Sequence, residues 1–159
     1  MGQLGVSAVA TRAHEEVFGY WASLRPNARL PSREDLNPFR LKRLLPTISL
    51  IDFDNNGQYR LRLAGTGLYS VYGREITGCT LDDVYSGPAS KYWREQLDKV
   101  ISERRPLVGC HNLGWRGSPH MSILWQRLPL ARNGRDVDMI LGYDAIVGTL
   151  SGTTGIRAA

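Results

Sequence analysis

The sequence has few cysteines and no long apolar run, and each scarcity narrows the possible functions. None of its apolar runs approaches the length of a membrane span, and the N-terminus lacks the basic-then-apolar order of a signal peptide. The two cysteines, Cys79 and Cys110, have neither CxxC spacing nor a secretory signal, which favours reduced, packed side chains over a disulfide. We therefore expect a cytoplasmic protein without a membrane segment.

Lysine is also scarce, because only Lys42, Lys91 and Lys99 occur and arginine supplies most of the positive charge. The formal net charge is +5 at pH 7, and the basic residues are scattered along the chain rather than gathered in one block. They are accompanied by neither a recognition-helix pattern nor an aromatic platform for RNA bases. Nucleic-acid binding is therefore an alternative function that the sequence disfavours.

Recognisable catalytic and metal-binding motifs are missing as well. Asp82 and Asp83 are adjacent at an expected helix start, where the helix dipole accounts for them, and no Gly-x-Ser-x-Gly or phosphate-binding glycine loop occurs. His14, His111 and His120 lack the spacing of zinc ligands. We expect neither enzyme activity nor a bound metal. A small enzyme of unknown chemistry is the second alternative.

What is present is enough apolar sequence for one domain, at 159 residues and 42% apolar content. Residues 7–24 are predicted to form an amphipathic helix in which Val17, Tyr20, Trp21 and Leu24 share one face. This stripe is larger than one side of a small sheet must cover, so we predict that it mediates self-association. The alternative is that the helix folds onto its own domain.

The middle of the chain predicts a hairpin followed by short helices. Residues 47–53 read as a strand, 58–64 should return antiparallel to it, and the Asn-Gly pair between them favours a tight turn. Residues 73–78, Gly-Arg-Glu-Ile-Thr-Gly, lead to Thr80, which can cap a short helix. The chain thus leaves its sheet after the second strand.

The second half predicts one long helix and three further strands. The helix covers residues 87–105 and stops at a proline. Alternating apolar residues and turn signals give strands at about residues 107–115, 121–130 and 136–147, and Asp144 is expected to point outward from the last strand. The Gly-, Ser- and Thr-rich tail over residues 148–159 is predicted to be disordered.

This order of elements, with the Gly-Arg-Glu-Ile-Thr-Gly segment between two short helices, resembles a PAS domain over residues 46–147, preceded by an N-terminal helical extension over residues 1–45. The resemblance implies an α+β fold, a five-stranded antiparallel sheet with helices on one face and an added N-terminal helix. Five further motifs are similar to those of the stand-alone PAS-like family common in alphaproteobacteria: Tyr20-Trp21-Ala-Ser-Leu24-Arg25, Leu30-Pro31-Ser32-Arg33, Asn37-Pro38, Leu44-Leu45-Pro46 and Arg62-Leu63-Ala64-Gly65-Thr66.

The resemblance leaves the cofactor unknown and disfavours both flavin and haem. A light-sensing flavin PAS domain would carry an Asn-Cys-Arg-Phe-Leu-Gln type stretch after Gly78, where this chain has Cys79-Thr80-Leu81. A haem PAS domain would offer a histidine on the long central helix, and residues 88–105 contain none.

As a family, the resemblance implies sensory or regulatory binding without a general catalytic chemistry. We predict a module that holds a small ligand between the sheet and the central helices or binds a protein partner. We expect it to form a homodimer or contact a signalling protein, and to signal by a conformational shift. For the aromatic candidates, ordinary core packing is the alternative, and Arg62 also suits a surface ion pair with Asp52 or Asp138. The candidate ligand-binding residues are Arg62, Thr66, Tyr69, Tyr72, His111, Trp125 and Tyr143.

Overall fold

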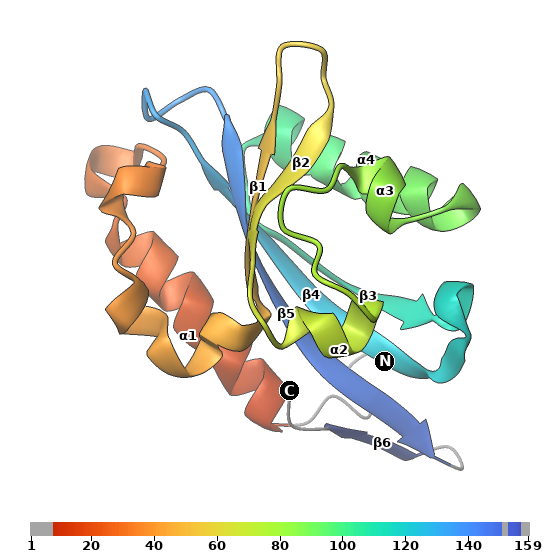
Figure 1. Cartoon of the computed structure of the whole chain (residues 1–159). Coiled ribbons are helices and arrows are strands. Elements are labelled where there is room, and N and C mark those ends of the chain that lie inside the picture. The colour runs from red at the N-terminus through yellow and green to blue at the C-terminus, as the bar shows by residue number, and fades with distance from the viewer. Residues whose placement is uncertain (1–7, 151–152, 157–159) are drawn as a thin grey trace.

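The computed structural model describes residues 8–150 and 153–156, which form an α+β fold around one antiparallel sheet (Figure 1). Its strands follow the order β2-β1-β5-β4-β3, and β6 pairs with β5. The predicted fold class is therefore confirmed. The strands are β1 (Ile48–Phe53), β2 (Tyr59–Ala64), β3 (Leu107–Leu113), β4 (Ser118–Leu130), β5 (Met139–Leu150) and β6 (Thr153–Ile156).

Helices cover both faces of this sheet. The described helices are α1 (Ala8–Ser23), α2 (Leu68–Tyr72), α3 (Leu81–Val84) and α4 (Gly87–Glu103), with short 3-10 helices η1 (Pro26–Ala28), η2 (Arg33–Asp35), η3 (Pro38–Thr47) and η4 (Gly114–Arg116). Figure 1 shows α1 and the chain through η3 on one side of the sheet and α2, α3 and α4 on the other. We call the first side the outer face and the second the inner face.

The β1–β2 hairpin forms where the turn residues predict it. The Asp54 carboxylate accepts hydrogen bonds from the backbone N–H groups of Asn56 at 2.9 Å and Gln58 at 3.0 Å. Gly57 has a φ of 75°, a conformation that glycine adopts without steric cost. The turn therefore fixes the antiparallel return of the chain from Phe53 to Tyr59.

The short helix α3 begins at the predicted cap. The Thr80 hydroxyl accepts a hydrogen bond from the Asp83 N–H at 3.3 Å, and the Asp83 carboxylate accepts one from the Thr80 N–H at 2.9 Å. This reciprocal pair satisfies donors that a helix start leaves open. Because the bonded carboxylate is stabilised in its charged form, the pKa of Asp83 is lowered.

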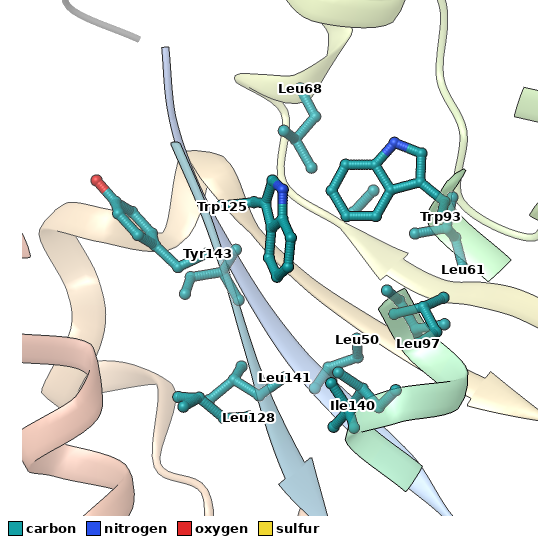
Figure 2. Packing of buried hydrophobic residues seen from close by; sticks show 14 of the residues in the cluster. Leu50, Leu61, Leu68, Trp93, Leu97, Trp125, Leu128, Ile140, Leu141 and Tyr143 are labelled. Carbon is teal, nitrogen blue, oxygen red and sulfur yellow. The ribbon is translucent and has the colours of Figure 1, made fainter. Parts of the chain in front are cut away.

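The apolar face of α4 packs on the inner face of the sheet. Trp93, Leu97 and Val100 recur at helical spacing and are fully or almost fully buried. Figure 2 shows Trp93 and Leu97 beside Trp125 of β4 and Leu61 of β2. Burying each such side chain contributes about 2 kcal/mol to folding, so this contact anchors the long helix.

The apolar stripe of α1 packs against its own domain. Val17 is 0% and Trp21 1% exposed, Tyr20 is buried, and Leu24 packs against the core. The Trp21 Nε1–H also donates a 2.8 Å hydrogen bond to the carbonyl of Pro129 on β4. The outer face is apolar enough to bury the whole stripe, so the structure shows the second of the two alternatives, and these side chains do not form a free self-association surface.

The C-terminal tail differs from the prediction of disorder. Strand β5 continues to Leu150, and β6 pairs with its end. In this pairing Ile156 lies opposite Val147, and Thr153 lies opposite Leu150. This pairing uses backbone groups, which every residue type carries, so a tail rich in Gly, Ser and Thr can form it. Residues 151–152 and 157–159 of the predicted tail, and Ser7 of the predicted first helix, lie outside the described residues.

Candidate functional site

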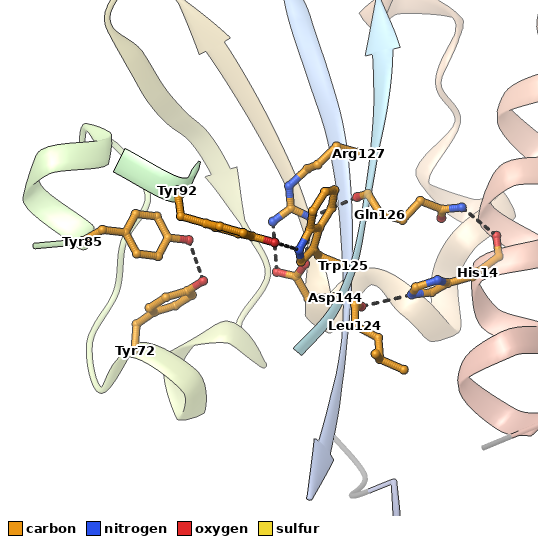
Figure 3. A network of polar contacts seen from close by, with 9 residues as sticks. All are labelled: His14, Tyr72, Tyr85, Tyr92, Leu124, Trp125, Gln126, Arg127 and Asp144. Carbon is orange, nitrogen blue, oxygen red and sulfur yellow. Dashed lines mark hydrogen bonds and ion pairs between the residues drawn. The ribbon is translucent and has the colours of Figure 1, made fainter. Parts of the chain in front are cut away.

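The inner face of the sheet holds a buried ion pair. Arg127 on β4 and Asp144 on β5 lie diagonally across the antiparallel register, since Arg127 faces Gly142 and Trp125 faces Asp144. The Arg127 Nη1 donates to Asp144 Oδ1 at 2.7 Å, and the side chains are only 3% and 2% exposed (Figure 3). The prediction that Asp144 points outward is therefore wrong, because α4 covers the face that it occupies.

Aromatic rings enclose the Arg127 guanidinium. It lies 4.7 Å from the centroid of the Trp93 ring and 5.9 Å from that of Trp125. A Cβ on Gly142 would come within 3.0 Å of Arg127 Nη1, so glycine leaves the space that the guanidinium uses. Burial opposes the charge, but attraction to Asp144 and their hydrogen bond together raise the pKa of Arg127.

Further aromatic residues continue this inner layer. The hydroxyls of Tyr72 and Tyr85 are 2.8 Å apart, and the Trp125 Nε1–H donates to the Tyr92 hydroxyl at 2.9 Å (Figure 3). Burial raises the pKa of each of the three tyrosines. His111 on β3 stacks on Tyr92 with ring centroids 4.3 Å apart, and burial lowers its pKa. These phenols and the imidazole therefore favour their neutral forms.

These side chains almost close the inner cavity. The space that is left between the sheet and α2, α3 and α4 has a volume of about 10 Å³, room for at most about one water molecule. A small-molecule site typically needs about 300 Å³ or more. In this conformation the predicted ligand position between the sheet and the central helices is filled. The cavity is lined by Ser49, Ile51, Leu61, Leu68, Tyr72, Ile76, Leu81, Tyr85, Trp93, Leu97, Arg127 and Asp144.

A much larger hollow, which we call the outer groove, lies on the opposite face. Its volume is about 500 Å³, and its walls come from α1, the η2–η3 segment and strands β1, β2 and β5. It is lined by Tyr20, Arg33, Leu36, Asn37, Pro38, Leu41, Lys42, Leu45, Pro46, Ile48, Leu50, Leu63, Ala64, Gly65, Thr66 and Leu141.

The wall formed by η3 is fixed by local hydrogen bonds and by close backbone contact. The Asn37 side chain accepts from the Phe39 N–H at 3.1 Å, and the Tyr20 hydroxyl accepts from the Asn37 N–H at 2.6 Å. A Cβ on Gly65 would overlap the carbonyls of Leu45 and Pro46, so glycine allows this approach. The sequence segments Leu44-Leu45-Pro46 and Arg62–Thr66 therefore meet at the groove.

Comparison with known proteins agrees with this architecture. A family model described as PAS domain matches residues 9–144. The chain belongs to the PAS domain family. Members of this family are generally sensory modules, and the match starts within α1, so it includes most of the N-terminal helical region.

Two LOV proteins are among the solved structures that match this chain. The d2 variant of RsLOV is 17% identical with a TM-score of 0.47, and the match covers 61% of this chain and 56% of that chain. This PAS chain therefore spans little more than half the length of that neighbour. A fungal LOV-domain photoreceptor is also 17% identical with a TM-score of 0.47, over 87% of this chain and 96% of its own. No curated protein matches the chain.

The PAS fold separates the predicted ligand residues into three places. Tyr72, His111 and Trp125 lie on the inner side, near the buried ion pair. Tyr143 points to the outer face, where its ring contacts His14 of α1 edge-on at 5.4 Å. The remaining three, Arg62, Tyr69 and Thr66, are exposed. Arg62 pairs with Asp52 at 3.4 Å, and Thr66 lies at the outer groove.

Sequence reasoning missed Arg127 and Asp144, the charged pair of this PAS domain. A signal for them exists, because Arg127 follows the nominated Trp125 by two residues and therefore shares its face of β4. Within the described part of the chain, no group of three or more His, Cys, Asp or Glu side chains could hold a metal ion. None of the described helices is both long and apolar enough to cross a bilayer.

Proposed function

We propose that this PAS domain is a non-catalytic regulatory module that binds a small molecule in the outer groove and signals by changing how α1 and η3 pack on the sheet. The observation that carries the proposal is the contrast between the two faces. The outer groove offers about 500 Å³, within the usual range for small-molecule sites, whereas the inner cavity offers about 10 Å³.

The position of the groove suggests how binding becomes a signal. A ligand there would touch Tyr20 of α1, residues of η2 and η3, and Leu50 and Leu141 of the sheet at the same time. It would therefore favour the arrangement in which these elements are docked together, because it binds that arrangement better than an open one. A signalling partner would then distinguish the docked N-terminal region from the open one.

Contacts of α1 with β4 can carry this change across the sheet. The Gln126 amide donates to the His14 carbonyl at 3.1 Å, and His14 Nε2 lies 3.0 Å from the Leu124 carbonyl (Figure 3). The next residue, Arg127, points to the inner face and holds Asp144. A shift of α1 would therefore move a strand whose alternate side chains reach both layers.

The test is a thermal-shift screen of a small-molecule library, because a ligand that binds the folded state raises the melting temperature. Leu63→Trp would fill the groove from β2, where Leu63 is 43% exposed. The matched control is Val108→Trp, at a residue 63% exposed on the other edge strand and outside the groove lining. We expect hits that stabilise the wild type and the control but not Leu63→Trp.

Hydrogen exchange measured with such a hit tests the signalling step. We expect slower exchange at backbone amides of α1 and η3, because the docked arrangement becomes more populated. A screen in which no compound stabilises the wild type, or in which every hit stabilises Leu63→Trp equally, would contradict the proposed groove site.

A further inference from the structure

The outer groove combines an apolar lining with positive charge. Most of its lining residues are apolar, and the buried aliphatic ones are Leu41, Ile48, Leu50, Ala64 and Leu141. Among the residues that the structure describes, the charged ones in the lining are Arg33 on η2 and Lys42 on η3, both basic, and none is Asp or Glu. A ligand that matches this surface has a long apolar part and a negative group.

The neutral polar groups of the groove are mostly engaged with the protein itself. The Tyr20 hydroxyl accepts from the Asn37 N–H at 2.6 Å, and the Asn37 side chain accepts from the Phe39 N–H at 3.1 Å. Among the described residues, Arg33 and Lys42 form no ion pair within 4.0 Å of a carboxylate. The polar groups free to receive a ligand are therefore chiefly these two exposed cations, which can form charge-assisted hydrogen bonds with a carboxylate that salt will screen.

We propose that the outer groove binds a single-chain amphipathic carboxylate of the fatty-acid class, and this rests on the proposed function of the groove as the ligand site. The alkyl chain lies on Leu50, Leu63 and Leu141, and the carboxylate is held at Arg33 and Lys42. Free acid and membrane lipid share this chemistry. The concave lining, with walls on α1, the η2–η3 segment and the sheet, favours a single chain over a flat bilayer surface.

The first measurement is titration of the full chain with dodecanoate, dodecanol and dodecyltrimethylammonium, each below the concentration at which it forms micelles. The three share one alkyl chain and differ in the charge of the head. We expect dodecanoate to bind at least about tenfold more tightly than the other two. Neither dodecanol nor dodecyltrimethylammonium has a carboxylate that can accept charged hydrogen bonds from Arg33 and Lys42. Shortening the acid by two carbons should weaken binding about tenfold, since apolar area is lost.

The second measurement uses charge variants. Arg33→Gln with Lys42→Gln should weaken dodecanoate binding about tenfold or more and leave dodecanol binding unchanged. The matched control is Lys99→Gln with Arg135→Gln, two exposed basic residues outside the groove lining, which makes the same change in net charge. It should bind dodecanoate like the wild type. Added salt should weaken dodecanoate binding to the wild type, which gives a readout that needs no variant.

The outcomes separate this inference from the proposed function. Equal binding of dodecanoate and dodecanol, or full dodecanoate binding by the Arg33/Lys42 variant, overturns the carboxylate inference and leaves an apolar ligand site. Flotation of the protein with vesicles of phosphatidylcholine and phosphatidylglycerol, without binding of free dodecanoate, also overturns it. Dodecanoate binding that Leu63→Trp leaves unchanged overturns the groove itself as the site, and with it the proposed function.

Discussion

At Arg127 and Asp144, two opposite charges have been taken out of water together. Each compensates the cost of burying the other, and the Trp93 ring covers the guanidinium at 4.7 Å. Such a pair adds little net stability compared with apolar residues, but it leaves a large cost when one partner is removed alone. The pair therefore fixes how β4, β5 and α4 pack together.

Asp144→Asn should test this dependence, because it keeps the shape of the side chain and removes its charge. We expect the free energy of unfolding in urea to fall by about 3–5 kcal/mol, since Arg127 stays buried without its counter-charge. The double variant Arg127→Met with Asp144→Leu should recover most of that loss. Asp52→Asn, at the partly exposed Asp52–Arg62 pair, is the control and should cost less than about 1 kcal/mol.

Replacing glycine with alanine should have opposite effects on stability at two positions. A Cβ on Gly109 of β3 would overlap the Trp125 ring, whereas a Cβ on Gly19 of α1 would have no heavy atom within 4 Å. Gly109→Ala should therefore lower the free energy of unfolding by about 1–3 kcal/mol. Gly19→Ala should raise it by about 0.5–1 kcal/mol, because alanine is the better helix former. Urea unfolding of both variants measures the difference, and equal effects would contradict the Trp125–Gly109 packing.

At the scale of elements, α1 depends on a neutral histidine. Burial lowers the pKa of His14, the hydrogen bond to Leu124 partly opposes this, Asp144 raises it and Arg127 lowers it. The unfolded chain therefore takes up a proton near pH 6.5, and the folded chain does so only at lower pH. The contribution of neutral His14 to the free energy of unfolding is therefore fully present above about pH 6.5 and is lost as the pH falls toward the pKa of His14 in the folded chain. His111, with its lowered pKa, adds in the same direction.

His14→Gln should reduce this loss of stability in acid. We expect the drop in unfolding free energy between about pH 7.5 and about pH 5.5 to be smaller in the variant than in the wild type, because one of the two histidines no longer titrates. His120→Gln, at an exposed histidine, is the control for the loss of one histidine. An identical drop in His14→Gln would show that His14 is not responsible.

Local patterns predict those elements whose determinants are close in sequence. The hairpin turn at Asp54, the Thr80 cap and the apolar face of α4 all depend on residues a few positions apart, and all three are found. The placement of α1 depends on contacts with β4, as in the Trp21–Pro129 hydrogen bond, and no local pattern encodes these. Alternation predicts a solvent face for Asp144 only if one side of the sheet is covered, but this sheet is covered on both sides.

At the scale of the whole molecule, the N-terminal helix α1 is part of the hydrophobic core and not a separate appendage. Deleting residues 1–25 would uncover the outer face that Val17 and Trp21 bury. We expect a lower melting temperature and a larger mass by light scattering than for the full chain, because exposed apolar patches associate. A full-length dimer that becomes a stable monomer on deletion would instead support self-association through the stripe of α1.

The candidate site was only partly predictable for the same reason. Thr66 was nominated from its motif and does border the outer groove, but the facing wall comes from residues 33–46 and from Leu141, far away in sequence. The space between the sheet and the helices is almost closed, because large side chains such as Trp93 and Arg127 pack into it, and sequence patterns do not predict that packing. Side-chain volume across separate elements decides which hollow is open.

The central position of β5 in the sheet has a consequence for synthesis on the ribosome. Strands β1 and β4 each pair with β5, and β5 is translated after both of them. Until residues 139–150 leave the exit tunnel, no strand joins the β1–β2 and β3–β4 hairpins. The helices of the outer and inner faces then have no complete sheet to pack on. The nascent domain therefore leaves apolar surface exposed until β5 has been synthesised, and its sheet can fold cooperatively only from that point.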